Sequence, residues 1–244
     1  MKKACFLALI VVAPFVGAVA APFQNLGFDE ANTNNVIDLA DGAFFGFTTE
    51  LLPGWTLLSG GGTEPVIGLN AFGTGHGYAT IASTNGQSSF NNLISDGYPM
   101  SGPYHLHLSP SIDRDTGEFL LYSLMQTGDV PLDAVSLRFV NYGNPFAVYL
   151  NGNEIALTYD YVPGPFFFDL FPAFVAGDIS AFAGQTVELK FVTLTAPQYS
   201  LNGLDGIFFS TVPIPEPSTY ALLLLGVVSV ACVRRLRFRA SRSP

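Results

Sequence analysis

Apolar and polar residues alternate with a period of two along several stretches of the chain. The clearest runs are Val135–Phe139, Phe146–Leu150 and Val187–Phe191. Such alternation places one face of a β-strand on a core and the other face in water. Asn151-Gly152 follows one of these runs and is a strong hairpin signal, because both residue types tolerate positive φ. The pattern predicts an all-β fold of two packed antiparallel sheets with jelly-roll topology.

Two histidines alternate with leucine in one of the predicted strands. His105 and His107 flank Leu106, so on a strand the two imidazoles share a face. Such a pair can begin a zinc site, but it needs a third ligand, and the chain offers only His76. The simpler interpretation is a pair of exposed strand histidines.

Charge is scarce and unevenly distributed along the chain. Of the 244 residues, 49% are apolar and 12% are charged, and the formal net charge is −9. Between Ala21 and Val212 the only cationic side chains are Arg114, Arg138 and Lys190, so this body is strongly acidic. An acidic surface repels phosphate backbones, which argues against nucleic-acid binding. The same surface suits cations, including calcium.

The front of the chain has the three parts of a secretory signal peptide. A positive start at Met1–Lys3 precedes the apolar run Ala4–Val12, and a small-x-small end follows at Ala18 and Ala20. We therefore expect a signal helix over residues 1–20, and signal peptidase to cut after Ala20 so that the mature chain begins at Ala21. The alternative is an uncleaved anchor.

The back of the chain has a proline-rich stem, an apolar run at Tyr220–Val233 and a cluster of arginines. A run of 14 residues is short for a bilayer core of about 30 Å. Arginine stems can snorkel, so we expect a short single transmembrane helix over residues 220–233. The arginines beyond it favour a cytoplasmic tail. The two cysteines, Cys5 and Cys232, lie in the two end segments, so the body has no disulfide.

The residues of this tail resemble the PEP-CTERM sorting signal. The motif residues precede an Ala-Leu-Leu-Leu-Leu-Gly run and the arginines, and they are Pro215, Glu216, Pro217, Ser218 and Thr219. The resemblance implies that an exosortase recognises segment 213–244 and removes it. The precursor would then be membrane-anchored, and the mature protein would lie at the cell surface or in the extracellular matrix. The alternative is a plain C-terminal anchor.

Segments at both ends of the body, residues 21–212, resemble the galactose-binding-like jelly rolls of many carbohydrate-binding modules. They are Asn25–Glu30, Leu52–Trp55, Asp178–Phe191 and Leu204–Phe209. The resemblance implies that the first and last strands run side by side. That family often has two acidic residues near the final strand, whereas the second position here is Gly206.

The resemblance also implies a structural calcium ion where the terminal strands meet. Asp29, Glu30 and Asp205 are its expected ligands, because calcium prefers several hard oxygen atoms. The alternative is three solvated carboxylates at strand ends. Flat aromatic side chains could also stack on sugar rings, and the candidates are Trp55, Tyr78, Tyr98, Tyr104 and Tyr161. The alternative for these aromatics is packing in the core and at its rim.

No motif with a catalytic function is present in the sequence. It has no Gly-x-Ser-x-Gly elbow, phosphate loop or His-Glu-x-x-His helix, and no pair of aspartates is singled out by spacing. We therefore expect a non-enzymatic surface or matrix protein that binds polysaccharide. A secreted carbohydrate hydrolase and a purely structural envelope protein are the alternatives.

Overall fold

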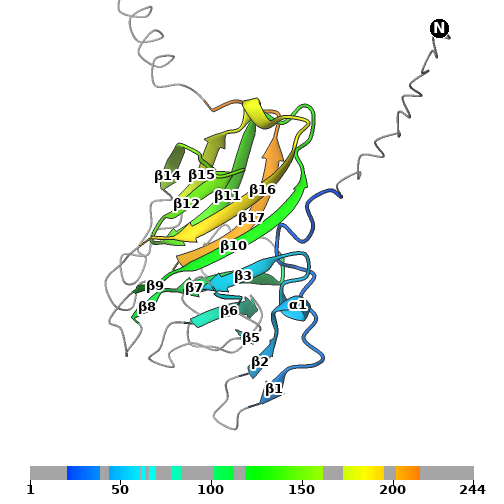
Figure 1. Ribbon diagram of the computed structural model, residues 1–244, viewed down its shortest axis with the longest axis vertical. Helices are drawn as coiled ribbons and strands as arrows, with labels where there is room; N and C mark the ends of the chain where they lie inside the picture. Colours follow the sequence, from blue (N-terminus) through cyan, green and yellow to red (C-terminus); the bar gives the residue numbers. More distant parts are fainter. Residues whose placement is uncertain are drawn as a thin grey trace, which may run out of the picture.

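The computed structural model describes residues 21–38, 44–60, 62–63, 66–69, 78–83, 102–112, 119–161, 173–194 and 202–214. The predicted signal segment and the predicted transmembrane helix lie outside these residues. Within them, two large β-sheets pack face to face as a β-sandwich with very little helix (Figure 1). The predicted all-β class and the two-sheet architecture are therefore confirmed.

The larger sheet has nine strands among the described residues. Their order is β1 (Ile37–Asp38), β2 (Phe44–Phe47), β5 (Val66–Leu69), β6 (Tyr78–Ser83), β7 (Tyr104–Ser109), β17 (Asn202–Ser210), β11 (Ser136–Gly143), β15 (Ala173–Asp178) and β14 (Leu157–Tyr161). The last strand of the described chain, β17, thus lies near the middle of this sheet, between β7 and β11.

The smaller sheet has six strands among the described residues. Their order is β13 (Asn153–Glu154), β12 (Phe146–Leu150), β16 (Thr186–Thr193), β10 (Tyr122–Asp129), β3 (Thr56–Ser59) and β4 (Gly62–Thr63). A separate pair is formed by β8 (Ser111–Ile112) and β9 (Phe119–Leu120). The helical elements are α1 (Thr48–Leu51) and the 3-10 turn η2 (Ser180–Phe182).

The predicted hairpin at Asn151-Gly152 joins β12 to β13. Both turn residues have positive φ, 48° for Asn151 and 77° for Gly152, and Leu150 pairs with Asn153 across the turn. The left-handed backbone matches the twist of the two strands. The prediction of antiparallel sheets is wrong for one pair, because β5 and β6 run parallel. Parallel neighbours cannot be joined by a two-residue hairpin, so this pair differs from the others in its connection as well.

Three phenylalanines link the two sheets in the middle of the core. Phe191 of β16 meets Phe139 of β11 edge to face, with 5.2 Å between the ring centroids, and meets Phe146 of β12 at 6.1 Å. All three side chains are buried. Each such side chain contributes about 1.5–3 kcal/mol of burial free energy, so this cluster holds the two layers together.

The N-terminal segment lies beside the last strand, but the expectation that the first and last strands run side by side is wrong, because β1 lies at the far edge of the sheet and β17 lies between β7 and β11. The N–H of Ile207 donates to the carbonyl of Leu26 over 3.2 Å. The ring of Phe23 packs on that of Phe209, with 5.1 Å between the centroids. The first residues of the described chain are therefore fixed to β17, although they do not add a full strand to the sheet.

Candidate functional site

The outer edge of the nine-stranded sheet presents aromatic side chains to solvent. Tyr161 ends β14 and is 59% exposed. Its ring is nearly parallel to that of Tyr159, with 6.0 Å between the centroids and 17° between the planes. The edge strand thus carries two nearly parallel aromatic rings, of which that of Tyr161 is exposed. We call Tyr159, Asp160 and Tyr161 of β14, with Phe174 of β15, the aromatic edge.

Tyr159 holds this surface against the other sheet. It is half-buried, and its hydroxyl donates to the carbonyl of Phe146 on β12 over 3.5 Å. Burial raises the pKa of Tyr159 to about 12, and the neighbouring Tyr161 phenol adds to the shift. The hydroxyl therefore stays protonated at physiological pH and keeps its donor role. Tyr159 fixes the ring geometry, while Tyr161 is accessible.

Asp160 and Phe174 form a cross-strand pair on the opposite face of the same edge. Phe174 is 50% exposed and Asp160 is exposed. Directly paired residues have Cβ atoms about 4.5–5.5 Å apart, so the carboxylate and the ring lie side by side. An apolar ring face beside a hydrogen-bond acceptor suits a ligand that presents both C–H and O–H groups. A sugar ring has this chemistry.

Sequence analysis singled out Tyr161 but missed the other three members of the aromatic edge. The available signal was the alternation in Leu157–Tyr161, which is typical of a strand with aromatics on one face. No sequence pattern indicated that Phe174 is exposed. It stands between the apolar residues Ala173 and Val175, which are buried, so the segment shows no alternation of apolar and polar residues.

A second polar group lies on the face of the nine-stranded sheet that points away from the core. His105 and His107 alternate along β7 with Leu106 and Leu108, which belong to the core. Both histidines are fully buried, so the prediction of exposed strand histidines is wrong. Their ring centroids are 4.6 Å apart. The shared face was predicted correctly, but periodicity could not show that this face is also covered.

Tyr142 of β11 reaches across β17 to this histidine pair. Gly203 of β17 pairs with Tyr142 on one side and with His107 on the other. The Tyr142 hydroxyl lies 2.6 Å from Nδ1 of His107. A Cβ atom at Gly203 would overlap the Tyr142 ring, so only glycine leaves room for the ring to cross.

Burial controls the charge of both histidines. Desolvation lowers the pKa of His105 to about 4, and neither of its ring nitrogens has a hydrogen-bond partner among the described residues. The pKa of His107 is held well below its usual value, mainly by burial and secondly by the nearby His105. Both imidazoles are therefore neutral at pH 7. His76, the third histidine of the predicted zinc group, lies outside the described residues.

The three predicted calcium ligands do not form a metal site. Across the described ranges, no group of three or more His, Cys, Asp or Glu side chains is placed to hold a metal ion. Oδ1 of the buried Asp205 accepts the N–H of Gly206 over 2.6 Å. Asp29 instead accepts the N–H of Tyr104 at the start of β7 over 3.4 Å, and Glu30 is exposed. Asp29 and Asp205 thus each accept a different backbone N–H, one at the start of β7 and one within β17.

Trp55 is a core residue, and the prediction of a sugar platform there is wrong. Only 4% of Trp55 is exposed, and its indole N–H donates to the carbonyl of Asn25 over 3.0 Å. The ring faces are therefore closed to a ligand. Tyr104 is half-buried and packs against the core. The side chain of Tyr78 and all of Tyr98 lie outside the described part of the chain.

The two predicted processing sites flank the β-sandwich. Ala21, the first described residue, is tied to the fold through its carbonyl, which accepts the N–H of Asp129 over 3.2 Å. At the other end, the described chain passes through Val212 to Ile214, and the Pro215–Thr219 motif follows. Within the described residues there is no helix with the length and apolar character needed for a membrane span.

The sequence after Val212 identifies how this protein is sorted. Residues 213–237 match the PEP-CTERM protein-sorting motif. The chain carries a PEP-CTERM tail. The PEP-CTERM tail marks an exported protein with a membrane-anchored precursor, which an exosortase-type enzyme processes for the cell surface. The predicted sorting signal and the predicted processing enzyme are thereby confirmed.

The body has only distant structural likenesses. The carbohydrate-binding module TmCBM61, solved with β-1,4-galactotriose, has 11% identity and a TM-score of 0.36, over 77% of this chain and 95% of that chain. The enzymatically active domain of bacteriophage CBA120 tailspike protein 4 has 14% identity and a TM-score of 0.33, over 65% and 19%. The GH31 α-xylosidase of Xanthomonas citri has 12% identity and a TM-score of 0.25, over 76% and 16%.

At these TM-scores the likenesses assign no function to the body. No curated protein matches the sequence significantly. The function of the β-sandwich therefore has to be argued from its own side chains.

Proposed function

We propose that this chain is a non-enzymatic, exosortase-processed surface or matrix protein whose aromatic edge binds polysaccharide. Signal peptidase releases the chain at Ala21, and removal of the PEP-CTERM tail completes the mature protein. The observation that carries the sugar-binding part is the nearly parallel, 6.0 Å arrangement of the Tyr159 ring with the exposed Tyr161 ring.

The chemistry of the aromatic edge supports a carbohydrate ligand over an apolar one. On one face of the edge the exposed Tyr161 ring offers a surface to the C–H groups of a pyranose. On the opposite face the Phe174 ring and the Asp160 carboxylate offer a second surface, with an acceptor for sugar hydroxyls. In the described part of the chain no strand pairs with the outer side of β14, so a long polysaccharide could pass along this edge. Neutral or cationic polysaccharides fit the acidic body better than polyanions do.

A binding screen tests this proposal directly. The full-length protein, kept in a non-glycosidic detergent, is applied to an array of plant, bacterial and algal polysaccharides. Tyr161→Ala should weaken binding to the best ligand at least about tenfold, because a centrally placed aromatic contributes about 2 kcal/mol or more when removed. Phe47→Ala is the matched control, since Phe47 is a 55% exposed aromatic on the edge region of the same sheet.

Three outcomes would count against the proposal. Absence of binding to every polysaccharide would favour a purely structural role. Equal loss in the Tyr161 and Phe47 variants would place the site elsewhere. Release of reducing sugar ends from a bound polysaccharide would identify the protein as a hydrolase.

A further inference from the structure

The turn between β10 and β11, residues 129–136, holds both ends of the described chain. On one side the N–H of Asp129 donates to the carbonyl of Ala21 over 3.2 Å. On the other side the carbonyl of Val212 accepts the Ser136 hydroxyl over 2.8 Å and Nη2 of Arg138 over 3.0 Å. Residues about 190 positions apart in the sequence therefore leave the sandwich from the same end.

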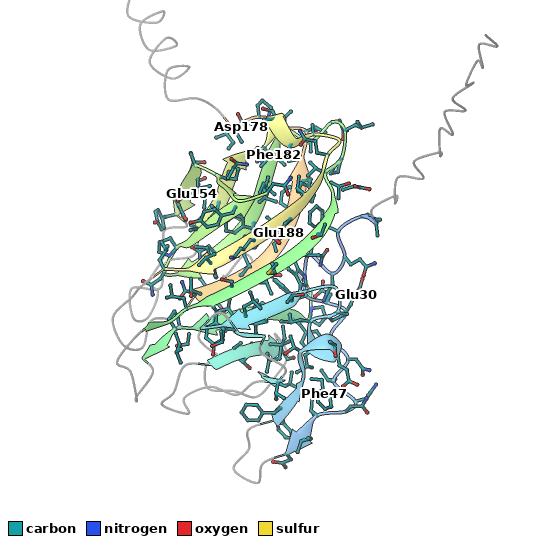
Figure 2. The ribbon with its side chains drawn as sticks, viewed as in Figure 1. Glu30, Phe47, Glu154, Asp178, Phe182 and Glu188 are labelled. Carbon is teal, nitrogen blue, oxygen red and sulfur yellow. The ribbon has the colours of Figure 1, made fainter. Side chains whose placement is uncertain are left out.

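Backbone hydrogen bonds make this end of the sandwich one connected surface. The N–H of Val135 donates to the carbonyl of Ser210, and the N–H of Ile179 donates to the carbonyl of Val135. The 3-10 turn η2 follows Ile179 and lies at this end too. Figure 2 shows Asp178 and Phe182 there, and Phe47 at the far end of the molecule. We call the turn 129–136, η2 and Val212 the terminal face.

The lengths of the flanking segments bring the terminal face close to the membrane. The PEP-CTERM match begins at residue 213, directly after the anchored Val212. The predicted apolar run begins at Tyr220, eight residues on. In the polyproline II conformation that prolines favour, such a stem would span about 25 Å at 3.1 Å per residue, and fully extended it would span less than about 30 Å. Before signal cleavage, the predicted signal segment would also be joined to the domain at this face, through Ala21.

The outermost side chain of the terminal face is apolar. Leu132 is 87% exposed at the tip of the turn and lies against Gly184. Val212, where the stem begins, is 55% exposed. Asp133 beside the tip and Asp178 near η2 are exposed carboxylates. The carboxylates disfavour anionic lipids, while the leucine suits the interface of a zwitterionic bilayer.

We infer that the terminal face is the membrane-proximal face of the precursor, and that Leu132 meets the headgroup region of a zwitterionic bilayer. This inference rests on the anchored precursor in the proposed function. It also orients the sugar-binding edge. On β14, Leu157 pairs with Gly177 near the terminal face, whereas Tyr161 pairs with Ala173, four residues or about 13 Å farther from the membrane. The aromatic edge therefore points its exposed end outward.

Energy transfer to the lipid surface tests the orientation. The full chain, with Cys5→Ser and Cys232→Ser, receives a single labelled cysteine at Leu132 or, as the control, at Phe47. Both variants are reconstituted in phosphatidylcholine vesicles that carry an acceptor dye on the headgroups. Strand β17 alone has nine residues and spans about 30 Å, so transfer from position 132 should exceed transfer from position 47 at least about twofold.

Equal transfer from the two positions, or greater transfer from position 47, would overturn the inference. Flotation of the vesicles reports separately whether each variant is anchored. A chain that fails to float would overturn the anchored precursor together with this orientation. Polysaccharide binding, measured on the same samples, does not depend on either result, so failure of the sugar-binding proposal remains distinguishable.

Discussion

Tyr142 and Gly203 are direct cross-strand partners, and the Tyr142 ring occupies the space that a side chain at position 203 would fill. The ring thereby reaches His107 on the next strand but one, and its hydroxyl lies 2.6 Å from Nδ1 of that histidine. This contact crosses three strands of the nine-stranded sheet. It connects β11, β17 and β7 by side chains, in addition to their backbone ladders.

Gly203→Ala should destabilise the domain because the new methyl group overlaps the Tyr142 ring. Forcing one extra carbon into a packed site typically costs about 1–3 kcal/mol in the free energy of unfolding. Denaturant unfolding measures this cost. Gly62→Ala is the matched control, because its Cβ would meet only the carbonyl of Ser59 at 3.7 Å, an ordinary contact. Equal stability of the two variants would contradict the crowding at Gly203.

Stability should fall as the pH is lowered from neutrality. The folded pKa of His105, about 4, lies below the ordinary value of 6.5. Between these values the unfolded chain binds a proton that the folded chain does not, so the free energy of unfolding decreases from pH 6.5 towards pH 4. The loss amounts to about 3 kcal/mol for His105, and His107 adds to it in the same direction. Urea unfolding at pH 7, 6 and 5 measures the slope.

The variant His105→Leu isolates this contribution. Neither ring nitrogen of His105 has a hydrogen-bond partner in the described part of the chain, so leucine removes a titrating group without breaking a hydrogen bond there. At pH 7 the variant should be at least as stable as the original protein. Its stability should change less between pH 7 and pH 5. Parallel pH profiles for the two proteins would show that another group controls the acid response.

Trp55 and Tyr161 should separate folding from ligand binding. Trp55→Phe loses the hydrogen bond to Asn25 and part of a buried ring, which should cost about 1–3 kcal/mol of stability while polysaccharide binding by the folded protein persists. Tyr161→Ala should behave in the opposite way, with stability changed by less than about 0.5 kcal/mol because the side chain is exposed. Thermal unfolding and polysaccharide binding, measured on both variants, test this reciprocal pattern.

Glu216→Ala should impair tail removal without unfolding the domain. Glu216 is the only charged residue between Val212 and the apolar run, so the processing enzyme has few other polar groups to recognise. The ratio of precursor to mature protein in the native host, read by intact mass spectrometry, is the measurement. Glu154→Ala, an exposed carboxylate on β13, serves as the control. Normal processing of the Glu216 variant would exclude recognition through this carboxylate.

The strands of the middle of the chain were predictable because alternation and turn chemistry act over a few residues. The runs at Phe146–Leu150 and Val187–Phe191 lie in β12 and β16, and the run at Val135–Phe139 coincides with the start of β11, one residue past its first member. The order of strands within the sheets was not predictable, because it depends on contacts such as that of Tyr142 with His107, 35 positions away. No local pattern encodes such a pair.

Among the predicted sugar-binding aromatics, the sequence indicated an exposed side chain correctly for Tyr161, which lies on an edge strand. The aromatic-rich alternation before it marks such a strand. Trp55 has the same chemistry but is buried, and the difference comes from Asn25, whose carbonyl accepts the indole N–H from 30 positions away. Two of the predicted calcium ligands, Asp205 and Asp29, each accept a backbone N–H in a different part of the fold, and no sequence pattern indicates this use.

The pair Gln24 and Gln126 has a consequence for the timing of secretion. The N–H of Gln24 donates to Oε1 of Gln126 over 2.6 Å, and Nε2 of Gln126 donates back to the carbonyl of Gln24 over 3.0 Å. These partners are separated by 102 residues, so this reciprocal pair of hydrogen bonds forms only after β10 has been synthesised. The predicted cut before Ala21 can therefore precede the docking of Gln24 on β10. The first described residues thus complete their contacts with the domain only after about half of the chain has been made.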